Sequence, residues 1–135
     1  MPDTFVLDTS AILTLWNDEE DADTVEKILR SPAALHISFM TRMEAGYRIW
    51  KKAGRTISEE FLRYLDLLPL KQVDASDEIL MMAMEIKATK KLSNADSWII
   101  ATAIATKAIL VHKDPEFEQV KDMVSLQTLK YKNRQ

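Results

Sequence analysis

The sequence contains no cysteine and is poor in glycine, proline and histidine. Its 135 residues include 2 glycines, 4 prolines and 2 histidines. The absence of cysteine excludes a disulfide scaffold, a thiolate-ligated zinc site and a cysteine nucleophile. The scarcity of histidine also excludes a histidine-rich metal site. Any metal site would therefore consist mainly of carboxylates, which favour hard cations such as Mg²⁺ or Mn²⁺.

The chain also lacks a recognisable targeting or membrane segment. The N-terminus has no basic region followed by an apolar one, and no apolar run approaches the length of a membrane span. We therefore expect a cytoplasmic protein with no membrane partner. The net charge of −3 argues against a passive nucleic-acid coat protein. A hydrophobic content of 47% is enough for a core, and the length predicts a single domain over residues 1–135.

Short apolar runs alternate with helical patterns along the chain. The apolar runs predict strands at residues 4–7, 35–38, 70–73, 108–111 and 125–129. The patterns between them predict helices at residues 11–16, 22–30, 41–52, 58–68, 77–90 and 93–107, with a short helical turn after residue 115. Continuous apolar strands are typical of parallel sheets covered on both faces. We therefore expect an α/β fold, a three-layer α/β/α sandwich with a mostly parallel central sheet.

Four acidic residues fall where the chain crosses one edge of this expected sheet. Each one either follows a strand or lies in the first turn of a helix: Asp8, Glu44, Asp96 and Asp114. Ligands of open α/β sheets bind beyond the carboxyl ends of the strands. Carboxylates gathered there would repel one another unless a divalent cation neutralised them. The placement indicates a candidate metal site.

Each of these acids also has a purely structural interpretation. The segments Thr41–Glu44 and Ser93–Asp96 have the spacing of a helix capping box. Asp8 suits the N-cap of the next helix, and Asp114 suits an ordinary turn that opens a helix. A cap is the favoured interpretation for any one acid alone, whereas four acids at a single edge favour a site.

Four segments resemble the motifs of PIN-domain nucleases, in the family's order. They are VLDTSAIL at 6–13, TRME at 41–44, LSNADSWIIATA at 92–103 and LVHKDPEF at 110–117. The compact length is similar to that of VapC-type toxins of type II toxin–antitoxin pairs. The resemblance implies a PIN-like fold and a Mg²⁺- or Mn²⁺-dependent endoribonuclease that hydrolyses RNA phosphodiester bonds as the toxin of such a pair. Two alternatives stay open: a PIN-like nuclease that is not a toxin, and a degenerate PIN-like binding module.

The resemblance also assigns roles to individual residues. The catalytic metal ligands that it implies are Asp8, Asp96 and Asp114, together with Glu44, which binds either directly or through water. Ser10 matches a supporting hydroxyl that orients either the first carboxylate or a metal-bound water, and Glu116 matches an additional acid found in some members. Three lysines that flank the third and fourth motifs are candidates for substrate binding: Lys90, Lys91 and Lys113. The partners implied are an RNA substrate, an antitoxin protein and a second copy of the chain in a homodimer.

Other side chains near these motifs have plainer expected roles. His112 stands where many members have Thr or Ser, so it either costs the site a hydroxyl hydrogen bond or contacts the substrate. A plain surface position beyond the sheet is favoured over a role as a ligand. Core packing is expected for most of the large apolar residues of the first helical regions: Trp16, Met40, Met43, Tyr47 and Trp50.

Two unrelated functions would also place an acid at the end of the first strand. A haloacid-dehalogenase-like phosphatase uses an aspartyl nucleophile there. Such sites usually carry a second Asp two residues later, where this chain has Ser10. A receiver-like phosphoacceptor requires paired acids near the first strand, and Phe5–Leu7 offers none. The sequence therefore favours the nuclease over both.

Overall fold

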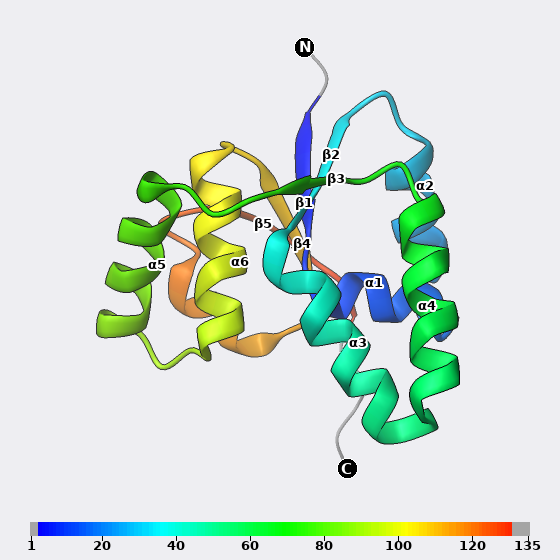
Figure 1. Cartoon of the computed structure of the whole chain (residues 1–135). Helices are drawn as coiled ribbons and strands as arrows, with labels where there is room; N and C mark the ends of the chain where they lie inside the picture. The colour runs from blue at the N-terminus through cyan, green and yellow to red at the C-terminus, as the bar shows by residue number, and fades with distance from the viewer. Residues whose placement is uncertain (1–2, 131–135) are drawn as a thin grey trace.

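A computed structural model describes residues 3–130 and places a five-stranded sheet at the centre of the chain (Figure 1). The strands are β1 (Thr4–Leu7), β2 (Ala34–Ser38), β3 (Lys71–Val73), β4 (Ile109–His112) and β5 (Ser125–Thr128). Their order across the sheet is β3-β2-β1-β4-β5, and every neighbouring pair is parallel. All five carboxyl ends therefore meet at one edge, as the sequence predicted.

Helices cover both faces of this sheet. They are α1 (Thr9–Trp16), α2 (Ala22–Arg30), α3 (Phe39–Ala53), α4 (Arg55–Leu67), α5 (Asp77–Thr89) and α6 (Asn94–Ala105), and a 3₁₀ helix η1 (Pro115–Val120) follows β4. Figure 1 shows α5 and α6 together on one side of the sheet and α1, α2 and α4 on the other. The expected α/β/α sandwich is confirmed.

The alternation of side chains along the strands separates two hydrophobic cores. Phe5 and Leu7 of β1 pack into a core with α1, α2 and α4. Val6, between them in sequence, packs into the second core with α5 and α6. Successive side chains of a strand point to opposite faces, so each strand contributes to both cores. This two-sided burial explains why the strands are apolar at consecutive positions.

The helix after β2 begins earlier than the sequence predicted. Ser38 is its N-cap, and the Ser38 Oγ accepts a hydrogen bond from the Met40 amide at 3.1 Å. The capping box expected at Thr41–Glu44 is therefore wrong, because both residues lie inside α3. A hydroxyl at the strand end is available to cap α3 three residues before Thr41. Glu44 has no part in the cap.

One face of α3 is exposed. Met43, Tyr47 and Trp50 recur at helical spacing and are about half exposed or more, so the core packing expected for them is wrong. Arg55 lies over the Trp50 ring, 5.7 Å from its centroid. The apolar surface of these three residues is called the α3 stripe below. Among the residues that the structure describes, no helix is both long enough and apolar enough to cross a membrane.

Candidate functional site

Asp8 follows β1 directly and caps the first helix. Its Oδ2 accepts hydrogen bonds from the Ser10 amide at 3.0 Å and from the Ser10 hydroxyl. The residue is only 3% exposed, and within residues 3–130 its second oxygen, Oδ1, is buried without a hydrogen-bond partner. Burial raises the pKa of Asp8 to about 6, and the charges of Glu44 and Asp114 add to the rise. A buried acceptor with no donor is a position where a cation can be held.

Glu44 and Asp96 lie beside this carboxylate. One oxygen from each of Asp8, Glu44 and Asp96 falls within 4.8 Å of the others. Glu44 projects from α3, and Asp96 lies in the first turn of α6, where its amide donates to the Ser93 Oγ at 3.1 Å. Burial, together with the charges of the neighbouring acids, raises the pKa of Asp96 to about 7. The hydroxyl half of the capping expected at Ser93 is therefore present, and the same turn presents an acid to the cluster.

A second acidic group shares Asp96 with the first. One oxygen from each of Asp96, Asp114 and Glu116 also falls within 4.8 Å of the others. Asp114 caps η1, and its Oδ1 accepts a hydrogen bond from the Glu116 amide at 2.9 Å. All four acids singled out from the sequence, together with Glu116, thus gather at the carboxyl edge of the sheet. Asp8 and Asp114 are caps as well as members of the cluster, so the two interpretations are compatible.

His112 is fully buried at the end of β4, so the surface position expected for it is wrong. Its Nδ1 accepts a hydrogen bond from the Asp114 amide at 3.0 Å, and its Nε2 lies 3.1 Å from the Thr128 Oγ1. The ring stacks on Phe117 at a centroid distance of 4.8 Å. Burial lowers the pKa of His112. Nothing in the sequence marks Phe117 and Thr128 as its partners, because they belong to later elements.

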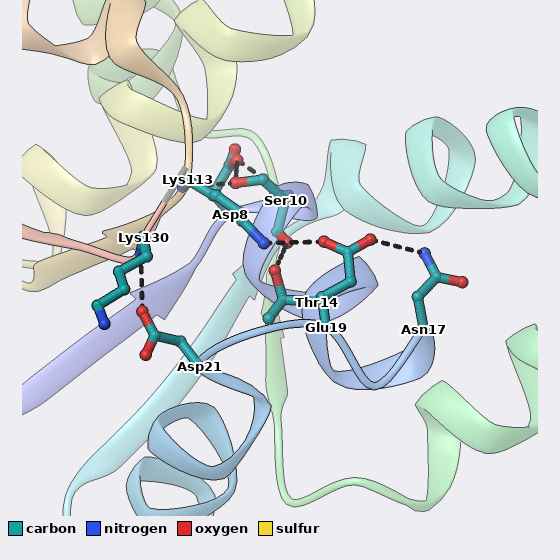
Figure 2. Close-up of polar contacts among 8 residues, drawn as sticks. All are labelled: Asp8, Ser10, Thr14, Asn17, Glu19, Asp21, Lys113 and Lys130. Atoms are coloured by element: carbon teal, nitrogen blue, oxygen red, sulfur yellow. Dashed lines mark hydrogen bonds and ion pairs between the residues drawn. The ribbon is translucent and has the colours of Figure 1, made fainter. Parts of the chain in front are cut away.

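The candidate lysines have different surroundings. The Lys113 Nζ forms an ion pair with the Glu19 carboxylate at 2.8 Å, and its side chain is only 10% exposed (Figure 2). Lys90 is half-buried and Lys91 is exposed. The Lys91 amide donates to the Gln119 Oε1 at 2.9 Å, and the Gln119 Nε2 donates back to the Lys91 carbonyl at 3.2 Å. These bonds hold the loop before α6 against η1, a contact that the sequence did not reveal.

The chemistry of this donor set suits a hard divalent cation. Every ligand atom in the two acidic groups is a carboxylate oxygen, the donor that Mg²⁺ and Mn²⁺ prefer. Burial, and to a smaller extent the charges of the neighbouring acids, raises the pKa values of Asp8 and Asp96, and a bound cation would offset both effects. The residues present therefore fit a divalent metal.

Comparison with known proteins identifies similar chains. The family model described as "PIN domain" matches residues 5–123. The structure is similar to VapBC2 from Rickettsia felis bound to a promoter DNA fragment, with a TM-score of 0.76 and 20% identity over 93% of this chain and 98% of that one. It is similar to DNA-bound VapBC from Salmonella typhimurium, with a TM-score of 0.74 and 20% identity over the same shares, 93% and 98%. It is also similar to Mycobacterium tuberculosis VapC20, a sarcin-ricin loop cleaving toxin, with a TM-score of 0.71 and 13% identity over 87% of this chain and 95% of that one. No curated protein matches the sequence.

Proposed function

The chain belongs to the PIN-domain family, and from this premise we propose that it is a metal-dependent endoribonuclease, the toxin of a toxin–antitoxin pair. One observation carries the proposal. The Asp8 carboxylate is buried, has one oxygen that receives no hydrogen bond from the residues that the structure describes, and lies within reach of the carboxylates of Glu44 and Asp96. Burying one carboxylate close to two others costs free energy unless a cation neutralises their charge. This cost is expected at a cation-binding site.

We propose Mg²⁺, or Mn²⁺ in its place, as the cofactor. Asp8, Glu44 and Asp96 would hold one cation, and Asp96, Asp114 and Glu116 offer a second, more exposed position. A bound divalent cation supplies Lewis acidity and a local positive charge toward an anionic phosphodiester. The shared position of Asp96 makes it the residue on which both groups depend.

The chain's own residues would prepare the site and receive the substrate. Ser10 fixes the orientation of Asp8 by donating its hydroxyl proton to Oδ2. We assign the contact with RNA phosphates to Lys91, and its exposed position on the loop before α6 supports this assignment. Lys90 is a candidate for the same role. The Lys113 ammonium is already paired with Glu19, so we assign it a lesser part in substrate binding.

We propose an antitoxin and a second copy of the chain as protein partners. Similar structures include toxin–antitoxin complexes, which supports an antitoxin as partner. Clustered carboxylates pair well with an arginine, so an antitoxin could block the site with one basic side chain. The exposed α3 stripe supports a homodimer, because monomers rarely expose adjoining large apolar side chains. We further propose that the protein acts in the cytoplasm, where RNA and Mg²⁺ are both present.

The direct test of the enzymatic proposal is an RNA cleavage assay. Structured and single-stranded RNAs are incubated with the protein and Mg²⁺ or Mn²⁺, with and without EDTA. We expect cleavage only with metal, yielding 5′-phosphate and 3′-hydroxyl ends, and none from Asp8→Asn. Asn is a good N-cap residue, so this variant should still fold. Equal cleavage in EDTA would refute the metal requirement, and full activity of folded Asp8→Asn would refute the site.

The toxin role is tested separately, by expression in a bacterial host. Wild-type protein should arrest growth, Asp8→Asn should not, and co-expression of a neighbouring small open reading frame should restore growth. If abundant wild-type protein and Asp8→Asn are equally harmless, the toxin role fails while a nuclease that is not a toxin remains consistent with the cleavage assay.

A further inference from the structure

The turn after β4 is held by side-chain acceptors at two consecutive amides. The Lys113 amide donates to the Ser10 Oγ at 2.9 Å, and the Asp114 amide donates to the His112 Nδ1 at 3.0 Å. Both amides lie between the last residue of β4 and the first residue of η1. In both cases the acceptor is a side-chain atom and not a backbone carbonyl of the sheet or of a helix. The backbone that presents Asp114 to the cluster is therefore positioned by Ser10 and His112.

The hydrogen bond from Asp114 determines the tautomer of His112. Its Nδ1 receives an N–H, so this nitrogen must be unprotonated, and a neutral imidazole then carries its proton on Nε2. Nε2 lies 3.1 Å from the Thr128 Oγ1, which can accept a hydrogen bond from this N–H group. The ring is fully buried, and both of its nitrogens are satisfied. His112 thus bridges β5 and the turn that carries Asp114.

The ring of His112 also contacts the element that carries Glu116. It stacks on Phe117, the next residue of η1, with 30° between the planes. Phe117 is itself fully buried. One side chain therefore contacts the turn at Asp114 through its edge and η1 through its face.

We propose that His112 is a positioning residue for the second acidic group. It accepts a hydrogen bond from the Asp114 amide and stacks on Phe117. These two contacts hold Asp114 and Glu116 at the distance from Asp96 that a shared cation requires. It does not contact Asp8 or Glu44 through any bond that the structure describes, so the first group should be independent of it. The consequence for cleavage rests on the proposed function, whereas the consequence for geometry and metal binding does not.

Two substitutions at position 112 separate the acceptor from the ring. His112→Phe keeps the aromatic face toward Phe117 and removes the acceptor. His112→Asn loses the aromatic ring but keeps an acceptor, because the Asn Oδ1 is bonded to Cγ as Nδ1 is in His. It can therefore still accept a hydrogen bond from the Asp114 amide. Thr128→Val is the matched control, because it removes only the contact at Nε2.

Manganese binding without RNA is the first readout. Losing a residue that orients a metal ligand typically weakens metal affinity by roughly tenfold to a hundredfold. We expect His112→Phe to weaken Mn²⁺ binding at the second, more exposed group by about that factor and to leave binding at the first within about twofold. His112→Asn and Thr128→Val should retain most of the affinity. Wild-type affinity in a folded Phe variant, or an Asn variant as weak as the Phe variant, would overturn the proposal.

Nuclear magnetic resonance of the wild-type protein provides a readout that depends neither on cleavage nor on a variant that folds. We expect the ring nitrogens of His112 to show an unprotonated Nδ1 and a protonated Nε2, and the Asp114 amide to exchange slowly with solvent. A proton on Nδ1 or rapid exchange at Asp114 would overturn the proposal. If the wild-type protein binds Mn²⁺ and passes these tests but cleaves no RNA, the proposed function fails and the positioning role stands.

With an active protein, steady-state kinetics completes the test. A residue that acts on the metal ligands should lower kcat and leave KM for RNA nearly unchanged. We therefore expect a fall in kcat for His112→Phe of the same order as its loss of metal affinity, with partial rescue at raised Mn²⁺ concentration. A change confined to KM would overturn the proposal.

Discussion

Ser10 and Lys113 lie 103 residues apart in sequence, yet the Lys113 amide donates a hydrogen bond to the Ser10 Oγ at 2.9 Å. The same Oγ donates its own proton to the Asp8 carboxylate (Figure 2). A serine hydroxyl donates one hydrogen bond through its proton and accepts others through its lone pairs, so both bonds can form at once. Ser10 thus joins the end of β1 to the end of β4, the two strands that lead into Asp8 and Asp114.

Replacing Ser10 by Ala should reduce cleavage far more than stability. The change removes the hydroxyl that orients Asp8 and leaves the Lys113 amide without this acceptor. We expect RNA cleavage to fall roughly tenfold to a hundredfold, as for other residues that orient a metal ligand, and unfolding free energy to fall by about 1–2 kcal/mol. Cleavage rates and urea denaturation measure the two effects.

The matched control for this change is Ser58→Ala. The buried Ser58 hydroxyl donates to the Gly46 carbonyl at 2.7 Å and joins α3 to α4 through a bond that includes no member of the acidic cluster. It should lose similar stability and keep its activity. If both serine variants lose activity in proportion to stability, Ser10 is only a structural link.

Asp96 should matter more for metal binding than any acid that belongs to one group alone. It contributes an oxygen to both acidic groups, whereas Glu116 belongs only to the second and is exposed. We expect Asp96→Asn to weaken all Mn²⁺ binding in a calorimetric titration. Glu116→Gln should weaken only the binding phase that belongs to the second group. A single binding phase that neither variant changes would show that the cluster is not the metal site.

In metal-free protein, Asp8→Asn should raise stability above about pH 6. Burial raises the Asp8 pKa to about 6 from an ordinary 3.8, so between these values the folded state holds a proton that the unfolded state has lost. Stability due to this group therefore falls as pH rises through that window, and above it the ionised carboxylate costs roughly 1–3 kcal/mol. Asn avoids the charge and keeps the N-cap.

Urea denaturation in EDTA at about pH 4 and about pH 7.5 measures this effect. We expect the advantage of Asp8→Asn at the higher pH to be nearly absent at the lower, where wild-type Asp8 is largely protonated in the folded state. Saturating Mg²⁺ should reverse the order, because it stabilises the wild-type protein more. A stability difference independent of pH and of metal would contradict a buried, uncompensated Asp8.

The sequence predicted the sheet and the cluster better than the details of each turn. The apolar run before Asp8 and the helix spacing at 22–30 depend on local pattern, and both elements were predicted within a residue of their bounds. The start of α3 was misplaced, because two hydroxyls, Ser38 and Thr41, are both plausible caps. Only packing decides between them. In the structure Ser38 caps α3, and Thr41 is a buried residue within the first turn of α3.

The contacts that shape the site could not be predicted, because they join distant segments. The bond from Lys113 to Ser10 and the contact of His112 with Thr128 depend on which strands are neighbours. Strand order is a property of the whole fold, and a single sequence contains no local sign of it. The exposure of Tyr47 on α3 has a similar cause, since apolar spacing on a helix does not reveal whether its own core or a partner covers that face.

Lys91 and Lys113 should differ when each is replaced by Gln, although they flank neighbouring motifs. Lys91 is exposed, so its ammonium is available to RNA phosphates. The Lys113 ammonium is mostly buried against Glu19. We expect Lys91→Gln to raise KM severalfold and to lower the salt dependence of binding by about one counterion. Lys113→Gln should leave KM nearly unchanged and lower the unfolding free energy by about 1 kcal/mol or more, because a partly buried pair contributes more than an exposed one. A double-mutant cycle with Glu19→Gln isolates the pair's own contribution. If Lys113→Gln raises KM as much as Lys91→Gln and leaves stability unchanged, the Lys113 side chain exchanges Glu19 for the substrate, and the role in RNA binding that the sequence suggested for it is restored.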